Sequence, residues 1–242
     1  MEAAIELTLV CHQIRSPDNL GAIARVAANF QVKRLILSDP ATHDFRGAEK
    51  LAIGAEHVLR DMAVAPTLTE ALSGAVYAVG TTSRTELKRR SALTPEEGVA
   101  ALRSHAARGP VALVLGGEKR GLSDEDLSRC QDVIVIPTSE AQPSMNVAQS
   151  AAVLLYLWHR AQAQVPVAAV EGASLAMVQA LEARMEKVLL AVQGLNAQAP
   201  EHVLRELTRS LVRAGLSKRE AELWLSVFGR LARVTSGEPP AG

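Results

Sequence analysis

The chain has 242 residues and a formal net charge of zero, because its 26 lysines and arginines equal its 26 aspartates and glutamates. This balance excludes a protein that grips nucleic acid through bulk positive charge and allows only local basic patches. Aromatic residues make up 3% of the chain, which argues against a platform on which bases stack. The length suits one α/β core and a smaller unit.

The cysteines and the apolar segments narrow the class of protein further. Cys11 and Cys130 lie far apart without a ligand-spaced partner, which favours two buried free thiols over a disulfide or a metal site. Glu2 and Glu6 interrupt the first apolar residues, so we expect no signal peptide. No apolar run approaches the roughly 20 residues that a membrane span needs. We therefore expect a cytoplasmic protein without a membrane segment and without a metal.

Short apolar segments alternate with helical patterns over the first two-thirds of the chain. The run Val111–Leu115, apolar at every position, is typical of a strand buried on both faces. Strands are expected over residues 5–11, 34–37, 75–80, 111–115 and 133–136. Between them, Ser16-Pro17 and Thr94-Pro95 each combine an N-cap side chain with a proline in the first helical turn. The alternation predicts an α/β domain with a mainly parallel sheet over residues 1–162.

The pattern beyond this domain is purely helical. A linker is expected over residues 163–173, a helical extension over residues 174–235 and a disordered tail over residues 236–242. Gly194 is placed to end the first helix of the extension, and Ser217 with Glu220 forms a capping box for the last one. These helices carry apolar faces that should pack on the first domain or on a second copy of the chain.

Three polar loops are expected directly after buried strands, at residues 81–84, 116–121 and 138–146. Because ligands bind at the carboxyl edge of such sheets, these loops could hold a nucleoside-like cofactor by their backbone groups, or they could be ordinary turns. The glycine-rich loop lacks the spacing of a phosphate-binding loop and of a dinucleotide fingerprint. This excludes a P-loop nucleotide hydrolase and a dinucleotide-binding fold of that kind.

Three motifs occur in order along the chain. They read Asn19-x-Gly21-x-x-x-Arg25, then Gly116-x-Glu118-x-x-Gly121-Leu122, then Ile136-Pro137 leading to Ser144-x-Asn146-Val147-Ala148. Together they resemble the motifs of the SpoU/TrmH group of SPOUT RNA methyltransferases, over about residues 5–160. The helical extension resembles that of the TrmJ branch, which methylates tRNA.

The resemblance implies a fold, a reaction and an assembly. The fold would be an α/β sheet whose C-terminal part forms a trefoil knot, which only the resemblance justifies because knots are nearly absent from proteins. The reaction would transfer a methyl group from S-adenosylmethionine to a ribose 2′-oxygen of RNA, with tRNA favoured over rRNA. The active form would be a homodimer.

The resemblance also implies roles for individual residues. The cofactor pocket would be lined by Thr81, Thr82, Ser83, Gly116, Ile136, Ser144, Met145 and Asn146. Asn19 and Arg25 would form the acceptor side, which could face the cofactor of the partner subunit. Glu118 would hold the loops or Asn19 in place, and Ser144 and Asn146 would orient the acceptor or Arg25. Because arginine stays protonated in proteins, Arg25 would stabilise the developing alkoxide or relay the proton through the RNA phosphate.

Two positions depart from the motifs of the family. Pro143 stands where relatives commonly have a small or flexible residue, and Gln31 stands where they commonly have glycine. Pro143 could therefore reshape the cofactor loop.

Basic residues that could contact RNA are Arg84, Lys88, Arg89 and Arg90, with further clusters at Lys119-Arg120 and at Arg205, Arg209 and Arg213. Such clusters either track phosphates or form a solvated face.

Three alternatives stay open from the sequence. The chain could methylate rRNA, including as a self-resistance enzyme, or it could methylate a base. It could also be a non-catalytic RNA-binding protein on the same fold.

Overall fold

The computed structural model describes residues 6–40, 42, 44–85, 87, 91–161, 170–195 and 200–235. The chain divides into two compact units, Met1–Ala168 and Ala169–Gly242. This division falls inside the segment 163–173 that the sequence predicts as a linker. Residues 163–169 of that segment and the predicted tail at 236–242 lie outside the described residues.

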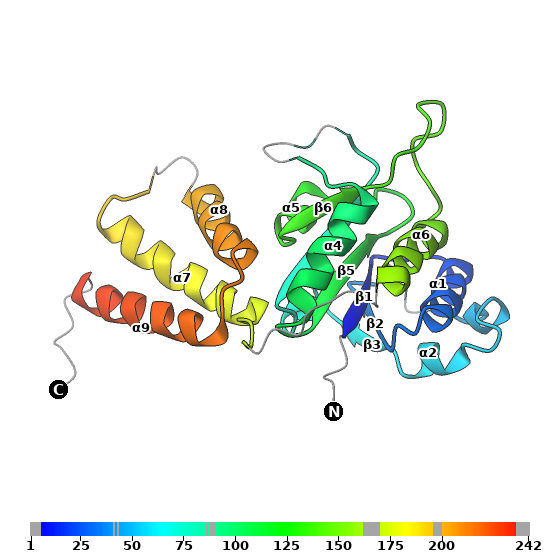
Figure 1. Cartoon of the computed structure of the whole chain (residues 1–242), viewed down its shortest axis with the longest axis horizontal. Helices are drawn as coiled ribbons and strands as arrows, with labels where there is room; N and C mark the ends of the chain where they lie inside the picture. Colours follow the sequence, from blue (N-terminus) through cyan, green and yellow to red (C-terminus); the bar gives the residue numbers. More distant parts are fainter. Residues whose placement is uncertain are drawn as a thin grey trace. The chain divides into compact units, whose positions relative to one another are not determined.

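The first unit is built on a six-stranded parallel sheet (Figure 1). Its strands are β1 (Leu7–His12), β2 (Arg34–Ser38), β3 (Ala63–Ala65), β4 (Tyr77–Thr82), β5 (Val111–Gly116) and β6 (Asp132–Val135). They are arranged in the order β3-β2-β1-β5-β4-β6, and every pair is parallel. All six residues of β1 and the first five of β5 are buried, as expected for central strands covered on both faces. The predicted α/β class with a parallel sheet is confirmed.

Helices connect the strands along the chain and pack on the sheet. They are α1 (Pro17–Asn29), the 3₁₀ turn η1 (Ala48–Lys50), α2 (Glu56–Arg60), α3 (Leu68–Leu72), α4 (Pro95–Ala106), α5 (Asp124–Ser128) and α6 (Val147–Arg160). The predicted caps are present, because the Ser16 hydroxyl accepts from the backbone of Asn19 and Thr94 forms a capping box with Glu97. Helices α1 and α6 pack side by side (Figure 1).

The order of the strands creates a switch point between β1 and β5. From β1 the chain adds β2 and then β3 on one side, and it then crosses to build β4, β5 and β6 on the other side. Ligands of open α/β sheets bind at the carboxyl edge near such a switch point. The strand pairings do not trace the trefoil knot, which stays a prediction.

The structure corrects the predicted end of β4. Thr81 and Thr82 belong to the strand and not to the loop, because they pair in register with Ile134 and Val135 of β6. Threonine is polar but β-branched, and β-branched side chains favour strands. The polar character of Thr81 and Thr82 therefore did not indicate that the strand had ended.

The second unit consists of α7 (Leu175–Ala191), α8 (Pro200–Arg213) and α9 (Lys218–Thr235). Helix α7 packs against both α8 and α9 around a small apolar core of Leu181, Met185 and Leu204. The predicted capping box is present, because Ser217 donates to Glu220 and accepts from its backbone. Helix α7 ends three residues before Gly194, and the left-handed residue is Gln193 with φ +55°.

The cysteines are free and buried, as predicted. Within the described ranges, no helix has the length and apolar character needed to cross a membrane. The same residues contain no group of three or more side chains that could hold a metal ion.

Candidate active site

A cavity of about 320 Å³ opens at the carboxyl edge of the sheet, where β4, β5 and β6 end. It is lined by Asn19, Thr81, Thr82, Ser83, Leu115, Gly116, Gly117, Glu118, Gly121, Ile134, Ile136, Thr138, Pro143, Ser144, Met145, Asn146, Val147 and Ser150. The walls therefore combine aliphatic side chains from the strand ends with hydroxyls, amides and backbone groups from the loops. Its volume lies at the lower end of the range of about 300–1,000 Å³ that is typical of small-molecule sites.

The cavity gathers residues from segments that are far apart in the sequence. All eight residues that the resemblance assigns to the cofactor are among its lining residues, and so are Asn19 and Glu118. Arg25 is not a lining residue, and its side chain is exposed on α1. The structure thus places four of the five predicted catalytic residues at one site and Arg25 elsewhere.

The wall beside β5 is a tight turn that only glycine permits. A Cβ on Gly116 would lie 2.4 Å from the carbonyl carbon of Gly121, which is far closer than real Cβ atoms approach. Gly121 has φ +61°, in the left-handed region, and its N–H donates to the Gly117 carbonyl at 2.9 Å. The turn over residues 117–121 therefore folds back against the end of β5.

Glu118 leaves this turn and binds the start of α1. Its carboxylate accepts hydrogen bonds from the N–H of Ser16 at 3.0 Å, from the N–H of Arg15 at 3.1 Å and from Nδ2 of Asn19 at 3.0 Å. Partial burial acts to raise the pKa of Glu118, but the hydrogen bonds from Asn19 and from backbone N–H groups outweigh it, so the pKa lies below its ordinary value. Glu118 is therefore an ionised anchor between the loops after β1 and β5.

Asn146 extends this anchor to the loop after β6. Its Oδ1 caps α6 by accepting from the N–H of Ala148 at 2.8 Å, so its Nδ2 is left to donate to Oδ1 of Asn19 at 2.9 Å. Asn19 must then direct its own Nδ2 toward Glu118, because a carboxylate only accepts. The orientation of both amides is thus fixed by the Glu118 carboxylate and by the N-terminus of α6. These hydrogen bonds hold the loops after β1, β5 and β6 in place relative to one another.

The loop after β6 is closed by its own contacts. The Thr138 hydroxyl donates to the Pro143 carbonyl at 3.0 Å, and Nε2 of Gln142 donates to the Ser144 carbonyl at 3.4 Å. Pro143, Ser144 and Met145 all line the cavity. Pro143 therefore contributes to the wall of the cavity and does not displace its neighbours from it.

The predicted RNA-contacting arginine on this side is engaged within the protein. Arg84 forms an ion pair with Asp124 at 2.5 Å and donates to the Leu122 carbonyl at 3.0 Å. Lys88, Arg89 and Arg90 lie outside the described residues.

Two of the three arginines on the second C-terminal helix are ion-paired within the protein, and the third, Arg213, is exposed. On α8, Arg209 is buried and pairs with Glu206, while Arg205 pairs with Glu182 and Glu201. Glu201 and Glu206 lie on α8 itself, whereas packing of α8 against α7 brings Glu182 to Arg205, which the spacing of four along α8 cannot indicate.

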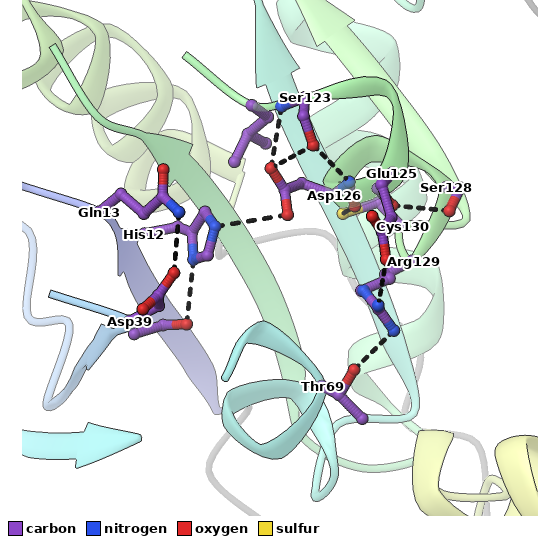
Figure 2. Close-up of polar contacts among 12 residues, drawn as sticks. His12, Gln13, Asp39, Thr69, Ser123, Glu125, Asp126, Ser128, Arg129 and Cys130 are labelled. Atoms are coloured by element: carbon purple, nitrogen blue, oxygen red, sulfur yellow. Dashed lines mark hydrogen bonds and ion pairs between the residues drawn. The ribbon is translucent and has the colours of Figure 1, made fainter. Parts of the chain in front are cut away.

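Sequence reasoning missed a buried polar network beside the site (Figure 2). His12 at the end of β1 is 3% exposed, with Nδ1 at 3.1 Å from the Ser38 hydroxyl and Nε2 at 3.3 Å from the Asp126 carboxylate. Asp126 also forms the capping box of α5 with Ser123. Ser38 is fully buried, so this triad fastens β1, β2 and α5 together and does not present a nucleophile. No local pattern links residues that lie so far apart.

Comparison with known proteins gives consistent matches along the chain. The model of the SpoU rRNA Methylase family matches residues 6–156. The tRNA (cytidine/uridine/adenosine-2′-O-)-methyltransferase TrmJ of Pseudomonas aeruginosa is 31% identical over 91% of each chain. The tRNA (cytidine/uridine-2′-O-)-methyltransferase TrmJ of Cronobacter sakazakii is 30% identical over 95% of this chain and 96% of its own. The crystal structure of TrmJ from Z. mobilis shares the fold, with a TM-score of 0.78 and 24% identity over 93% of this chain and 98% of its own.

Proposed function

The chain belongs to the SpoU methylase family, and from this membership we propose that it is an S-adenosylmethionine-dependent tRNA 2′-O-ribose methyltransferase. The observation that carries the proposal is the cavity at the ends of β4, β5 and β6, whose loops are joined by the Glu118–Asn19–Asn146 chain of hydrogen bonds. The preference for tRNA comes from relatives that are named as tRNA methyltransferases and align over more than nine-tenths of this chain. We place the enzyme in the cytoplasm, with its tRNA substrate.

The cavity fits the cofactor in size and in chemistry. Leu115, Ile134 and Ile136 offer aliphatic walls suited to an adenine ring, while the loops offer backbone N–H and C=O groups that suit its polar edges. Gly116 shapes this wall, because a Cβ there would lie 2.4 Å from the backbone of Gly121, and both glycines line the cavity. When bound, S-adenosylmethionine supplies a methyl group attached to a positively charged sulfur. We assign its binding to the eight lining residues Thr81, Thr82, Ser83, Gly116, Ile136, Ser144, Met145 and Asn146.

The fixed amides position the acceptor. Asn19 and Asn146 lie at the cavity with both of their orientations set by hydrogen bonds, so they need no reorganisation when RNA binds. Methyl transfer requires the ribose oxygen to approach in line with the breaking bond, and such positioning can supply most of the rate. We therefore assign Glu118 to positioning, through Asn19, and not to proton transfer.

Arg25 acts on the ribose that accepts the methyl group. It is exposed on α1 and has no ion-pair partner within the described part of the chain, so its charge is available to an outside anion. A guanidinium stays protonated, so Arg25 stabilises the alkoxide that develops on the ribose or passes the proton through an RNA phosphate. Because Arg25 does not line the cavity of its own chain, we propose that it serves the cavity of a partner subunit in a homodimer.

A mixing experiment tests this shared site. Arg25→Ala and Gly116→Ala are each expected to be inactive. Arg25→Ala lacks the guanidinium charge, and Gly116→Ala does not bind the cofactor. Mixed dimers hold one intact site, so an equal mixture should regain about a quarter of wild-type activity, given random pairing in a two-fold dimer. Activity that stays at zero after subunit exchange has been verified would show that Arg25 serves its own chain.

The substrate is tested with a panel of RNAs. Purified protein and labelled S-adenosylmethionine are incubated with unmodified tRNA and with rRNA, and transfer to each is counted. We expect transfer to tRNA. The matching family description names rRNA, so exclusive transfer to rRNA would move the substrate and keep the reaction. Absence of cofactor binding in calorimetry would make a non-catalytic RNA-binding protein the better description.

A further inference from the structure

We propose that a second cavity beside the candidate active site binds a backbone phosphate of the substrate RNA; this inference rests on the proposed function. The second cavity also measures about 320 Å³ and is lined by Gln13, Arg15, Gly117, Lys119, Arg120 and Gly121. Gly117 and Gly121 line both cavities, so the turn over residues 117–121 is their common wall. We call this second cavity the basic cavity.

Charge distinguishes the basic cavity from the rest of the first unit. Three of its six lining residues are cations and none is acidic. The side chains of Arg15, Lys119 and Arg120 are exposed and have no ion-pair partner among the residues described. Four other arginines of this unit, Arg34, Arg46, Arg84 and Arg129, each have a carboxylate within 4 Å, whereas Arg25 on α1 has none across the described ranges. A protein with zero net charge thus keeps a local positive field at this place.

The acidic residue of the turn faces away from this field. Glu118 lines the first cavity and not the second, and its carboxylate is occupied by the N–H groups of Arg15 and Ser16 and by Asn19. The turn therefore separates its charges, with the anion on the cofactor side and both cations on the other side. The charged side chains that line the basic cavity are therefore all cations, and its one neutral polar side chain, Gln13, donates a hydrogen bond from its NH₂ group to Asp39.

The floor of the basic cavity is formed before any ligand arrives. A Cβ on Gly117 would lie 2.4 Å from the Gln13 carbonyl oxygen, so the turn packs directly on the chain that leaves β1. Gln13 has φ +55°, and its amide donates to Asp39 at 2.8 Å. Directly before it, His12 contacts Asp126, as Figure 2 shows, and its other ring nitrogen lies 3.1 Å from the Ser38 hydroxyl. A rigid floor lowers the entropic cost of binding.

These features suit one phosphate group of an RNA strand. Guanidinium forks bind phosphate oxygens in pairs, and a lysine adds a compact point charge. The phosphates that flank a ribose are the charged groups nearest to its 2′-oxygen, and the basic cavity shares a wall with the site proposed for methyl transfer. A phosphate held there would fix the acceptor strand without reading its sequence.

The test neutralises the turn and compares it with another adjacent lysine and arginine of the same unit. The variant is Lys119→Gln with Arg120→Gln. The control is Lys33→Gln with Arg34→Gln, which removes two cations where β2 begins, at the opposite edge of the parallel sheet. Binding of unmodified tRNA is measured over a series of salt concentrations, and cofactor binding is measured by calorimetry. A third variant, Lys119→Arg with Arg120→Lys, keeps both charges.

We expect the neutralised variant to bind tRNA at least about tenfold more weakly, with a log–log salt slope smaller by about 1, because one phosphate contact is lost. Cofactor affinity, the control and the charge-conserving variant should match the wild type. Wild-type affinity and slope in the neutralised variant, or an equal loss in the control, would overturn the phosphate site. If the phosphate site is overturned but the wild-type protein methylates ribose, only this inference fails. If the wild-type protein neither binds nor methylates RNA, this inference and the proposed function both fail.

Discussion

Replacing Glu118 by glutamine should destabilise the fold and loosen the site, because glutamine keeps the shape and loses the charge. The Glu118 carboxylate accepts from two backbone N–H groups and from Asn19. A glutamine offers one oxygen and one NH₂ group, so one N–H donor would face another donor. Hydrogen bonds to charged groups contribute about 1.5–3 kcal/mol, and partial exposure of Glu118 lowers the expected loss to about 1–2 kcal/mol.

The pKa of Glu118 gives this loss a pH dependence with a definite sign. The pKa in the folded protein lies below the ordinary value of 4.5, so the ionised group stabilises the fold above that pH. The contribution disappears as the pH falls through the folded pKa, because protonation removes the charge and turns one of the two acceptor oxygens into a donor. Wild type and Glu118→Gln should therefore differ fully at pH 7 and converge below about pH 4.5.

Urea unfolding at several pH values measures this difference directly. Glu96→Gln is the control, since Glu96 also lies in the first unit, and its loss should change the free energy of unfolding by less than about 0.5 kcal/mol. A Glu118→Gln variant as stable as wild type at pH 7 would refute the anchoring role. A difference that persisted unchanged at low pH would show that shape, and not charge, was lost.

Three further predictions follow from single positions. Gly116→Ala should weaken cofactor binding at least tenfold in calorimetry, because its Cβ would lie 2.4 Å from backbone, whereas Gly74→Ala, with nothing within 4 Å, should bind normally. Gln31→Gly should raise the free energy of unfolding by roughly 0.5–1 kcal/mol, because Gln31 holds φ +59° at the end of α1; an unchanged midpoint in urea would contradict this strain. Burial, aided by Glu118, raises the pKa of Cys11 to about 12, so an alkylating reagent at pH 8 should label Cys11 only after unfolding; labelling of native protein would show that Cys11 is accessible.

Much of the fold could be predicted because its signals are local. The apolar run Val111–Leu115 predicted a buried strand, and β5 covers it with one further residue. The N-cap side chains at Ser16, Thr94 and Asn146 accept hydrogen bonds from the helices that they begin. The resemblance to SpoU methyltransferases is confirmed by the family match and by the relatives.

The remaining features depend on pairings that no local pattern contains. The position of β4 between β5 and β6 makes Thr81 part of a strand, although its sequence reads as the start of a loop. His12 meets Ser38 and Asp126 only because β1, β2 and α5 converge. The sequence placed Glu118 in a motif, but the backbone donors of Arg15 and Ser16 that determine its charge state became visible only in three dimensions.

The same reasoning applies to the C-terminal arginines. Spacing by four on α8 correctly predicts one helical face, but the packing partner decides whether that face is free. Glu182 of α7 lies at 3.9 Å from Arg205, so part of this face is engaged in ion pairs within the protein. Prediction of a basic patch from one helix therefore needs knowledge of the acidic residues on the helix packed against it.

The central claim is that this chain methylates a ribose and that Arg25 is needed for the transfer. The measurement is a digest of tRNA after incubation with S-adenosylmethionine and either wild-type protein or Arg25→Ala, with the nucleosides identified by mass spectrometry. The account predicts a 2′-O-methylnucleoside with wild-type protein, none with Arg25→Ala, and equal cofactor binding by both. A methylated base, or full ribose methylation by Arg25→Ala, would contradict it.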